Sequence, residues 1–405
     1  MTQECVVIDR TQMKPGATER VRVAVTPEES YGAEYPAELS SILSRDDVRK
    51  AYDFFCRLPG YTRTPLVEHQ GLADECHVAS VMIKDEGQRT PTHSFKVLGP
   101  PYALANQLLL RIGQTNLNLA DVAEGTRKSE LQGLTACAAT SGNHGRALAW
   151  ASKQFGCQCR IYMPDFTGIY REEQIRKFGA TTVRVPGTYD AAVECAAQDA
   201  EIRGYVLVGN GTQPNSDVLR HNVHGYSILG EELISSRPNN ITATHVFVPA
   251  GGGSLAAALT GRLWMEYGSS RPKVVIVQPH AVDSAYQSCL QRACVPAQGD
   301  LATLMDGLSV RELAADAWEI LRRGAFAFTT IGDEVALKVL KRFHQDNLTA
   351  VGETGIAAIA AFMAAASDAD VRRQLVLNET SQVVVIATEG ITDPGVLNRL
   401  VGFRK

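Results

Sequence analysis

Short apolar segments alternate with segments of helical character between residues 134 and 208. The expected strands are 134–140, 160–163, 182–185 and 205–208. The expected helices between them are 147–155, 170–178 and 189–202. A chain that repeats strand and helix at this spacing forms a parallel sheet with right-handed crossover connections. The sequence therefore predicts an α/β fold.

The second half of the chain continues with apolar strands, expected at residues 244–250, 274–278, 327–330 and 383–387. The first of these runs into Gly251, Gly252, Gly253 and Ser254, and residues 255–259 then have strong helix propensity. Strand, glycine turn and helix form a phosphate-binding arrangement, because glycines let backbone N–H groups approach an anion at a helix N-terminus. A tight turn packed close to a helix explains the same residues equally well.

Lys96 stands at the junction between an expected strand, residues 81–86, and a segment of helical character, residues 97–110. Phe95 and Val97 flank it, so its side chain is expected in a partly apolar pocket. Burial disfavours the charged form of an amine and makes the neutral form available for Schiff-base chemistry. Most lysines near a helix start are solvated, so this stretch alone does not decide between the two possibilities.

A polar loop follows the strand expected at residues 134–140. It contains Ser141, Asn143 and His144 among glycines, at the strand end where open α/β sheets place their ligands. A reactive lysine, a phosphate-binding turn and a polar loop are the features that pyridoxal phosphate needs, because this cofactor is an aldehyde that carries a phosphate. Together they predict a pyridoxal-phosphate enzyme.

The segments 94–96, 141–145 and 251–254 resemble those of the fold-type II pyridoxal-phosphate enzymes. A closer resemblance, to the diaminopropionate ammonia-lyases, rests on segments 58–61, 64–66, 84–86, 95–99, 142–146, 161–164, 352–355 and 387–393. It implies a two-lobed α/β fold like that of the tryptophan synthase β subunit, with a mostly parallel sheet flanked by helices in each lobe. Residues 97–215 would form a smaller lobe, inserted into a larger one made of residues 1–96 and 216–405, with an N-terminal arm at 1–45.

The resemblance also implies a role for each matched residue. Lys96 would bind pyridoxal 5′-phosphate as a Schiff base and move the substrate α-proton. Asn143 would form a hydrogen bond with the cofactor 3′-oxygen, and the backbone amides of residues 251–254 would hold its phosphate. Thr388 would face the pyridine nitrogen, where a neutral hydroxyl suits elimination at Cβ better than an aspartate would. Glu353 would line the cofactor face or serve as a structural carboxylate behind it.

Two positions depart from the ammonia-lyase pattern. That family carries aspartates where this chain has Ser141 and Gly209, and it uses the first of them on the D-substrate. A protonated leaving amine needs a group that holds or protonates it, so we expect a different β-substituted amino acid, as its L-isomer. Asn210, Thr212 and Gln213 follow a strand end and either replace the second aspartate or form a plain polar turn.

The implied function is an α,β-elimination, in which the amino acid passes through an aminoacrylate and releases ammonia and a keto acid. Serine and threonine dehydratases and β-replacement synthases carry a serine at the position of Ser141. The alternatives are a synthase that joins a second nucleophile to the aminoacrylate, a serine/threonine dehydratase, or a racemase in which Ser141 acts on the opposite face. A cofactor-free scaffold is a further alternative, although Lys96, Asn143 and Thr388 are all retained.

Length and composition fit this interpretation. The chain has 405 residues, of which 45% are hydrophobic, and a formal charge of −4, which suits two lobes with a large core. The near-neutral charge and the absence of a membrane-length apolar run give no reason to expect nucleic acid or a membrane as partner. Residues 1–19 lack a signal-peptide core, and nine cysteines, with only Cys157 and Cys159 closely spaced, suit a reducing compartment. We expect a cytoplasmic homodimer that uses a small amino-acid substrate and no metal ion.

Four further polar side chains lie close to the expected site in the sequence. His144 either packs within its loop or touches the substrate, and His93 is expected to be solvated. Tyr102 is expected in the core, and Arg146 is expected to pair within its lobe.

The N-terminal segment differs in character from the rest of the chain. Residues 1–45 contain several prolines and glycines and are expected to form an irregular arm on the body. Residues 46–55 then form an expected helix capped by Ser44.

Overall fold

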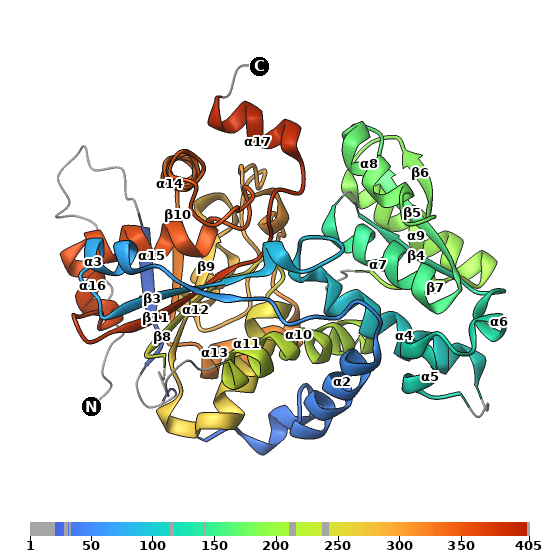
Figure 1. Cartoon of the computed structure of the whole chain (residues 1–405), viewed down its shortest axis with the longest axis horizontal. Coiled ribbons are helices and arrows are strands. Elements are labelled where there is room, and N and C mark those ends of the chain that lie inside the picture. The colour runs from blue at the N-terminus through green and yellow to red at the C-terminus, as the bar shows by residue number, and fades with distance from the viewer. Residues whose placement is uncertain are drawn as a thin grey trace.

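The computed structural model describes residues 21–27, 31, 34–113, 117–140, 142–209, 216–236 and 243–402 of the 405-residue chain. Two β-sheets organise these residues, one of seven strands and one of four. In Figure 1 the four-stranded sheet and its helices lie on the right, and the seven-stranded sheet lies on the left. This arrangement agrees with the predicted two-lobed α/β fold.

The larger sheet has the strand order β1-β10-β9-β8-β11-β3-β2. Its five central strands are parallel, and they are β10 (Ala327–Ile331), β9 (Lys273–Pro279), β8 (His245–Pro249), β11 (Gln382–Ala387) and β3 (Ser80–Asp85). The outer strands β1 (Val21–Val25) and β2 (Leu66–Glu68) run antiparallel to their neighbours. The central strands are nearly continuous runs of buried residues, as expected for parallel strands with both faces covered.

Strand β1 corrects the expectation that residues 1–45 form an irregular arm. Val21–Val25 pairs with β10 along its whole length. The segment alternates valine with Arg22 and Ala24, a period-two pattern that suits an edge strand. Prolines and glycines on both sides of this short segment concealed it in the sequence.

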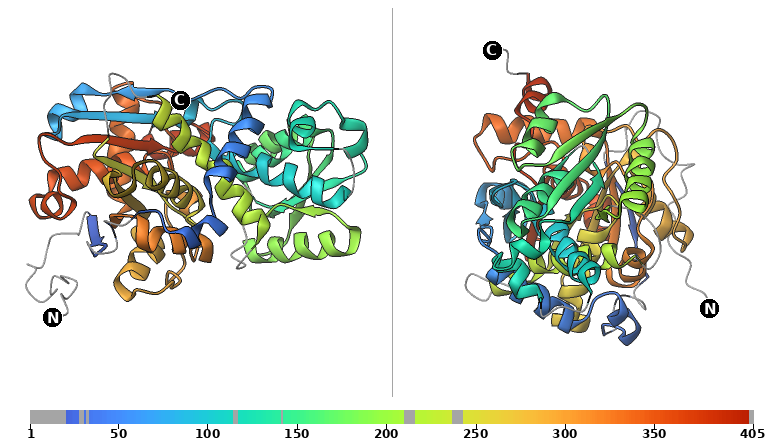
Figure 2. Two further views of the ribbon diagram at one scale, coloured as in Figure 1. Left: turned by 90° about the horizontal axis from the view of Figure 1, so that it is seen from below. Right: turned by 90° about the vertical axis from the view of Figure 1, so that its right-hand side faces the viewer.

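The smaller sheet has the order β6-β5-β4-β7, and every neighbouring pair is parallel. Its strands are β4 (Thr135–Ala139), β5 (Gln158–Pro164), β6 (Thr181–Val185) and β7 (Val206–Leu207), joined by α7 (Asn143–Phe155), α8 (Ile169–Arg176) and α9 (Tyr189–Arg203). The left view of Figure 2 shows this unit beside the larger sheet. The predicted alternation is confirmed, although α7 begins at Asn143 rather than at residue 147.

The remaining helices lie around the two sheets or join them. They are α2 (Arg45–Arg57), α3 (Gln70–Glu75), α4 (Gly99–Ile112), α5 (Leu119–Glu124), α6 (Lys128–Leu131), α10 (Asp217–Ser235), α11 (Ser254–Tyr267), α12 (Ser284–Gln291), α13 (Ala315–Gly324), α14 (Asp333–Gln345), α15 (Ala357–Ser367), α16 (Ala369–Leu375) and α17 (Pro394–Val401). The predicted cap of α2 is confirmed, because the Ser44 side chain accepts a hydrogen bond from the Asp47 amide and Asp47 accepts one from the Ser44 amide. None of the described helices is long and apolar enough to cross a membrane.

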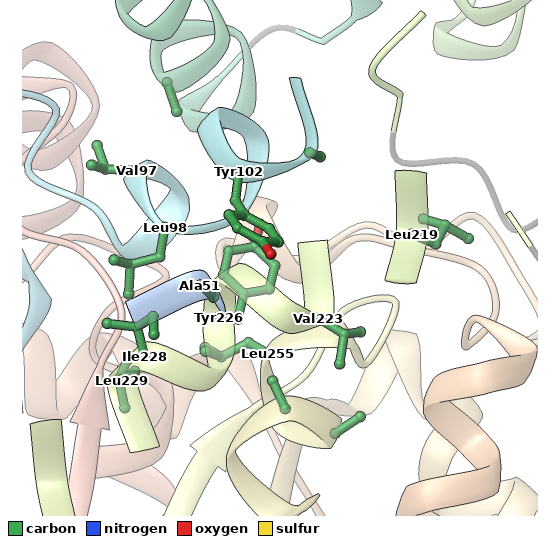
Figure 3. Close-up of a cluster of buried hydrophobic side chains, with 14 of the residues drawn as sticks. Ala51, Val97, Leu98, Tyr102, Leu219, Val223, Tyr226, Ile228, Leu229 and Leu255 are labelled. Atoms are coloured by element: carbon green, nitrogen blue, oxygen red, sulfur yellow. The ribbon is translucent and has the colours of Figure 1, made fainter. Parts of the chain in front are cut away.

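Helix α10 packs against α2, α4 and α11 where the two lobes meet. Figure 3 shows Tyr102 of α4 and Tyr226 of α10 in the apolar core of this junction, so Tyr102 is a core residue as expected. The contact between α10 and the start of α4 requires glycine. A Cβ on Gly225 would lie 2.1 Å from the Leu98 carbonyl oxygen, and one on Gly99 would lie 2.3 Å from the Tyr226 ring. Any side chain at either position would push α10 away from the segment that carries Lys96.

Four charged side chains form a buried network beside this junction. Lys84 of β3 donates to Glu232 of α10 at 2.6 Å, and Arg89 donates to Glu232 at 2.9 Å and to Glu86 at 2.5 Å. All four side chains are at most 2% exposed. Burial opposes the charge on Glu232, yet Arg89 and Lys84 together lower its pKa. The two cations and two anions balance, and they fix the loop that leads from β3 toward Lys96 against α10.

The network predicts a large loss of stability for Glu232→Ala. The substitution leaves Lys84 and Arg89 buried without this partner, which costs about 3–5 kcal/mol of unfolding free energy. Urea denaturation followed by circular dichroism measures the loss. The matched control is Glu124→Ala, which removes an exposed pair with Arg57 and costs at most about 1 kcal/mol. Equal losses in the two variants would contradict a special role for the network.

Candidate active site

Three of the predicted site segments follow parallel strands of the larger sheet. The glycine turn follows β8, Thr388 follows β11, and the loop to Lys96 follows β3. Strand β11 lies between β8 and β3 and runs parallel to both. The carboxyl ends of all three strands therefore meet at one edge of the sheet, where α/β proteins bind their ligands.

Lys96 lies in the 3₁₀ turn Phe95–Val97, directly before α4. Its Nζ atom is 5.1 Å from the centre of the Phe95 ring and 5.7 Å from that of Tyr226. The Phe95 amide donates a 3.1 Å hydrogen bond to the Thr388 carbonyl oxygen, which ties this turn to the end of β11. Burial lowers the pKa of Lys96 to about 8, while the Glu389 carboxylate acts in the opposite direction. A larger share of the amine is therefore neutral near neutral pH than for an ordinary lysine.

Thr388 places a hydroxyl group directly after β11. The residue is 2% exposed, and its Oγ1 has no hydrogen-bond partner among the described residues. A buried polar group without a partner costs about 1–3 kcal/mol. A ligand with a ring nitrogen at this place would pair with the hydroxyl, so Thr388 fits the pyridine of pyridoxal phosphate.

The glycine turn at residues 251–254 ends in the first residue of α11, a helix of 14 residues. Gly253 has a φ of 86°, and a Cβ there would lie 3.0 Å from the Leu313 side chain. Gly252 and Ser254 are partly exposed at the N-terminus of the helix. The turn therefore fits a phosphate group.

Asn143 is the first residue of α7 and reaches across from the smaller sheet to the larger one. Its Nδ2 donates to the Glu389 carboxylate, and Arg146 donates to its Oδ1 at 3.3 Å. Arg146 thus pairs within its own helix, as predicted. Ser141, the other residue predicted in this loop, lies outside the described residues.

Glu353 lies in the segment before α15, and its side chain is 3% exposed. Arg171 of α8 approaches its Oε1 to 3.4 Å, while its Oε2 has no hydrogen-bond partner in the described part of the chain. Arg171 also lies 2.6 Å from Asp306 and 3.7 Å from Asp393. The smaller lobe thus contributes one arginine to three carboxylates of the larger lobe.

Glu389 and Arg171 are site residues that the sequence did not predict. Glu389 is buried, and burial raises its pKa to about 7, with the charge of Glu353 acting in the same direction and that of Arg171 opposing it. Its position directly after Thr388, at the carboxyl end of a buried strand, was the signal in the sequence. Arg171 gave no comparable signal, because its partners are distant in the chain.

The two histidines near the site contact backbone carbonyl oxygens. His144 is buried, and its Nε2 donates to the Val208 carbonyl oxygen at 2.7 Å, so it packs within the lobe. His93 is exposed and bonds the Gly87 carbonyl oxygen at 2.9 Å. The predicted candidates Asn210, Thr212 and Gln213 lie outside the described residues. Within the described ranges no three His, Cys, Asp or Glu side chains cluster as metal ligands would.

The lowered pKa of Lys96 predicts how the cofactor-free protein reacts with pyridoxal phosphate. Only a neutral amine attacks an aldehyde, so the rate of Schiff-base formation should rise with pH through a midpoint near 8. Stopped-flow absorbance measures this rate, and a free lysine derivative corrects for titration of the cofactor itself. Lys96→Ala should abolish the absorbance change. A midpoint near the ordinary lysine value of 10.5 would contradict the prediction.

Known proteins resemble this chain in sequence and in fold. The chain matches the family model of the pyridoxal-phosphate dependent enzymes over residues 57–389. It is 31% identical over 369 residues to a diaminopropionate ammonia-lyase of Escherichia coli (strain K12), and the match covers 89% of this chain and 92% of the relative.

The crystal structure of an Escherichia coli diaminopropionate ammonia-lyase in complex with an aminoacrylate-PLP azomethine reaction intermediate superposes on this chain with a TM-score of 0.83 at 28% identity. The superposition covers 94% of this chain and 96% of the other. A processed threonine deaminase from Solanum lycopersicum shares the fold, with a TM-score of 0.72 at 19% identity and the same coverage of both chains. The predicted fold and cofactor are thereby confirmed, and the chain belongs to the pyridoxal-phosphate-dependent enzymes as a fold-type II lyase.

Proposed function

We propose that this lyase catalyses an α,β-elimination on a β-substituted amino acid and releases ammonia and a keto acid. The observation that carries the proposal is the position of Lys96, whose amine has a pKa of about 8 and whose turn is bonded to Thr388. Similarity to diaminopropionate ammonia-lyases over 89% of the chain supports this reaction type.

Each candidate site residue has a proposed task. Bound pyridoxal phosphate supplies an electron sink for the carbanion at the substrate α-carbon. Lys96 holds the cofactor and moves the α-proton, and Asn143 orients the ring through its 3′-oxygen. The amides of residues 251–254 hold the phosphate. The Thr388 hydroxyl pairs with the ring nitrogen, and because it is neutral it favours elimination over transamination.

The residues at positions 141 and 209 bear on which group leaves the substrate β-carbon. Ser141 and Gly209 stand where the ammonia-lyases are expected to carry aspartates, so we propose a β-substituted L-amino acid other than diaminopropionate as the substrate. Ser141 would then act as a hydroxyl near the substrate, and Glu353 would line the cofactor face. The buried position of Glu353 beside Arg171 supports this placement.

A β-replacement synthase is the second candidate function. It would use the same lysine and cofactor but admit a second nucleophile in place of water. The serine at position 141, expected in such synthases, favours this alternative. Dehydratase and racemase activities are further alternatives that the same serine leaves open.

The lobe boundaries at residues 97 and 215, the homodimer and the cytoplasmic location remain predictions. The position of all four strands of the smaller sheet between Thr135 and Leu207 supports the proposed boundaries.

The proposal is tested by titrating the purified holoenzyme with L- and D-amino acids and recording its visible spectrum. The panel contains both diaminopropionate isomers, serine, threonine and O-activated serines, with ammonia and keto acid assayed in parallel. We expect a spectral change with keto acid release for an L-amino acid, and none in Lys96→Ala. Product formed only with an added thiol or amine acceptor would indicate the synthase, and rapid ammonia release from D-diaminopropionate would overturn the proposed substrate.

The proposed phosphate site predicts the effect of Gly253→Ala on cofactor binding. The φ of 86° at Gly253 costs an L-residue about 1–2 kcal/mol, and a Cβ there also meets Leu313. If the native turn is needed to hold the phosphate, the affinity for pyridoxal phosphate should fall about tenfold. Fluorescence titration of the cofactor-free protein measures this affinity.

The matched control is Gly179→Ala, because Gly179 has a φ of 88° with open space at its Cβ and lies far from the turn in sequence. We expect Gly179→Ala to lower stability but to leave cofactor affinity unchanged. Equal affinity in the two variants would argue against phosphate binding by the turn at residues 251–254.

A further inference from the structure

Arg146 is a buried cation in the first turn of α7, beside the candidate site. The residue is 7% exposed, and within the described part of the chain its guanidinium forms no ion pair with a carboxylate and its Nε has no hydrogen-bond partner. Burial lowers the pKa of Arg146, while Glu389 and Tyr170 act in the opposite direction. A guanidinium nevertheless stays charged in a protein, and the positive end of the helix dipole lies at this turn. The position of Arg146 therefore costs stability, so we looked for what its side chain does there.

The side-chain amide of Asn143 is bonded at both of its ends. Arg146, three residues later on the same helix, donates to the Oδ1 atom at 3.3 Å. The Nδ2 atom donates to the carboxyl group of Glu389 in the larger lobe. A guanidinium contains only donors, so the end of the amide that faces Arg146 must be the oxygen. The nitrogen is then directed toward Glu389.

The two partners of Asn143 differ in how firmly they fix the orientation of its amide. Burial raises the pKa of Glu389 to about 7, so a share of this group is protonated near neutral pH. A protonated carboxyl group contains a donor as well as an acceptor, and it can pair with either end of an amide. Arg146 is a donor in every state, and it is therefore the partner that distinguishes the oxygen of Asn143 from the nitrogen.

The first turn of α7 holds Asn143 and Arg146 in a fixed relation. Residues three apart on a helix lie on the same face, so the two side chains are neighbours. A Cβ on Gly145 would lie 2.7 Å from the Thr140 side chain, which shows how closely this turn packs against the end of β4. His144, between them in the sequence, bonds the Val208 carbonyl oxygen at 2.7 Å. The turn is thus held on the smaller sheet independently of the bond between Arg146 and Asn143.

We propose that Arg146 is a positioning residue, which fixes the amide of Asn143 so that its Nδ2 atom faces the 3′-oxygen of the cofactor. An amide nitrogen carries two hydrogens, so Nδ2 can donate to Glu389 and to the 3′-oxygen together. The reversed amide would bring Oδ1 against the ionised 3′-oxygen, and two acceptors repel each other. The inference rests on the proposed contact between Asn143 and the cofactor, and it does not depend on which amino acid is the substrate.

The test measures how strongly the cofactor-free protein prefers pyridoxal phosphate to 3-deoxypyridoxal phosphate, which keeps the aldehyde and the phosphate but lacks the 3′-oxygen. The preference is the ratio of the two dissociation constants from fluorescence titration. Comparing this ratio between variants cancels the intrinsic difference between the two compounds. In Arg146→Met the preference should fall about fivefold, because one well-oriented hydrogen bond is lost. A loss of general packing would weaken both compounds equally and leave the ratio unchanged.

Two further substitutions at this position separate its donor character from its size. Arg146→Lys keeps a group that only donates, so it should recover part of the preference. Arg146→Gln keeps a polar side chain, but its amide offers both a donor and an acceptor and should lower the preference as Arg146→Met does. This variant also serves if Arg146→Met does not fold. An unchanged ratio in Arg146→Met or, if that variant does not fold, in Arg146→Gln would overturn the proposal.

A double variant tests whether Arg146 acts through Asn143. Asn143→Ala alone should lower the preference, and adding Arg146→Met should lower it no further, since residues that act through one contact are not additive. A further fall in the double variant would overturn this route. The matched control is Arg271→Met, which removes a buried arginine that donates to the carbonyl oxygens of Gly268 and Gly324. It should lower stability and leave the preference at the wild-type value.

The binding ratio separates this inference from the proposed function. If no amino acid in the panel is converted, the proposed elimination fails, while the ratio in the Arg146 variants still decides whether this residue positions Asn143. If the wild-type protein and Asn143→Ala show the same ratio, Asn143 does not contact the 3′-oxygen and the inference is overturned, whereas the elimination remains to be judged by its products.

Discussion

The ion pair between Lys84 and Glu232 joins the strand that leads to Lys96 to the helix that carries Tyr226. Both charges are fully buried, and Arg89 and Glu86 complete a balanced network around them. Charges in such a place are tolerated only when their partners are present and well oriented. The network therefore holds the loop after β3 in one position against α10. Because the turn with Lys96 follows this loop directly, the network also fixes the position of that turn.

The site is assembled from both lobes, and no single segment completes it. Lys96, Thr388 and the glycine turn lie at one edge of the larger sheet, whereas Asn143 comes from the smaller sheet. The hydrogen bond from Asn143 to Glu389 and the approach of Arg171 to Glu353 both cross between the lobes. The surroundings of the buried carboxyl groups thus depend on how the two lobes are placed.

Local patterns in the sequence predicted the elements that depend on local physics. Runs of apolar residues predicted the parallel strands, and glycines predicted the turn at residues 251–254. The flanking Phe95 and Val97 predicted a partly apolar pocket for Lys96. Strand β1 was missed because its pairing with β10 involves residues some 300 positions away. Glu389 had no predicted role for a related reason, since its burial and its bond to Asn143 arise only when both sheets are in place.

The two groups of buried or partly buried charges differ in their contact with solvent. The Lys84 network is dry, whereas Arg171 is 23% exposed and its partner Asp306 is 58% exposed. Dissolved ions screen exposed charges over about 8 Å at physiological salt and leave buried pairs nearly unaffected. A higher ionic strength should therefore weaken the pair of Arg171 and Asp306, which crosses between the lobes. The buried pair of Lys84 and Glu232 should stay nearly unchanged. In a saltier medium the two lobes would then depend more on their buried contacts, among them the hydrogen bond from Asn143 to Glu389.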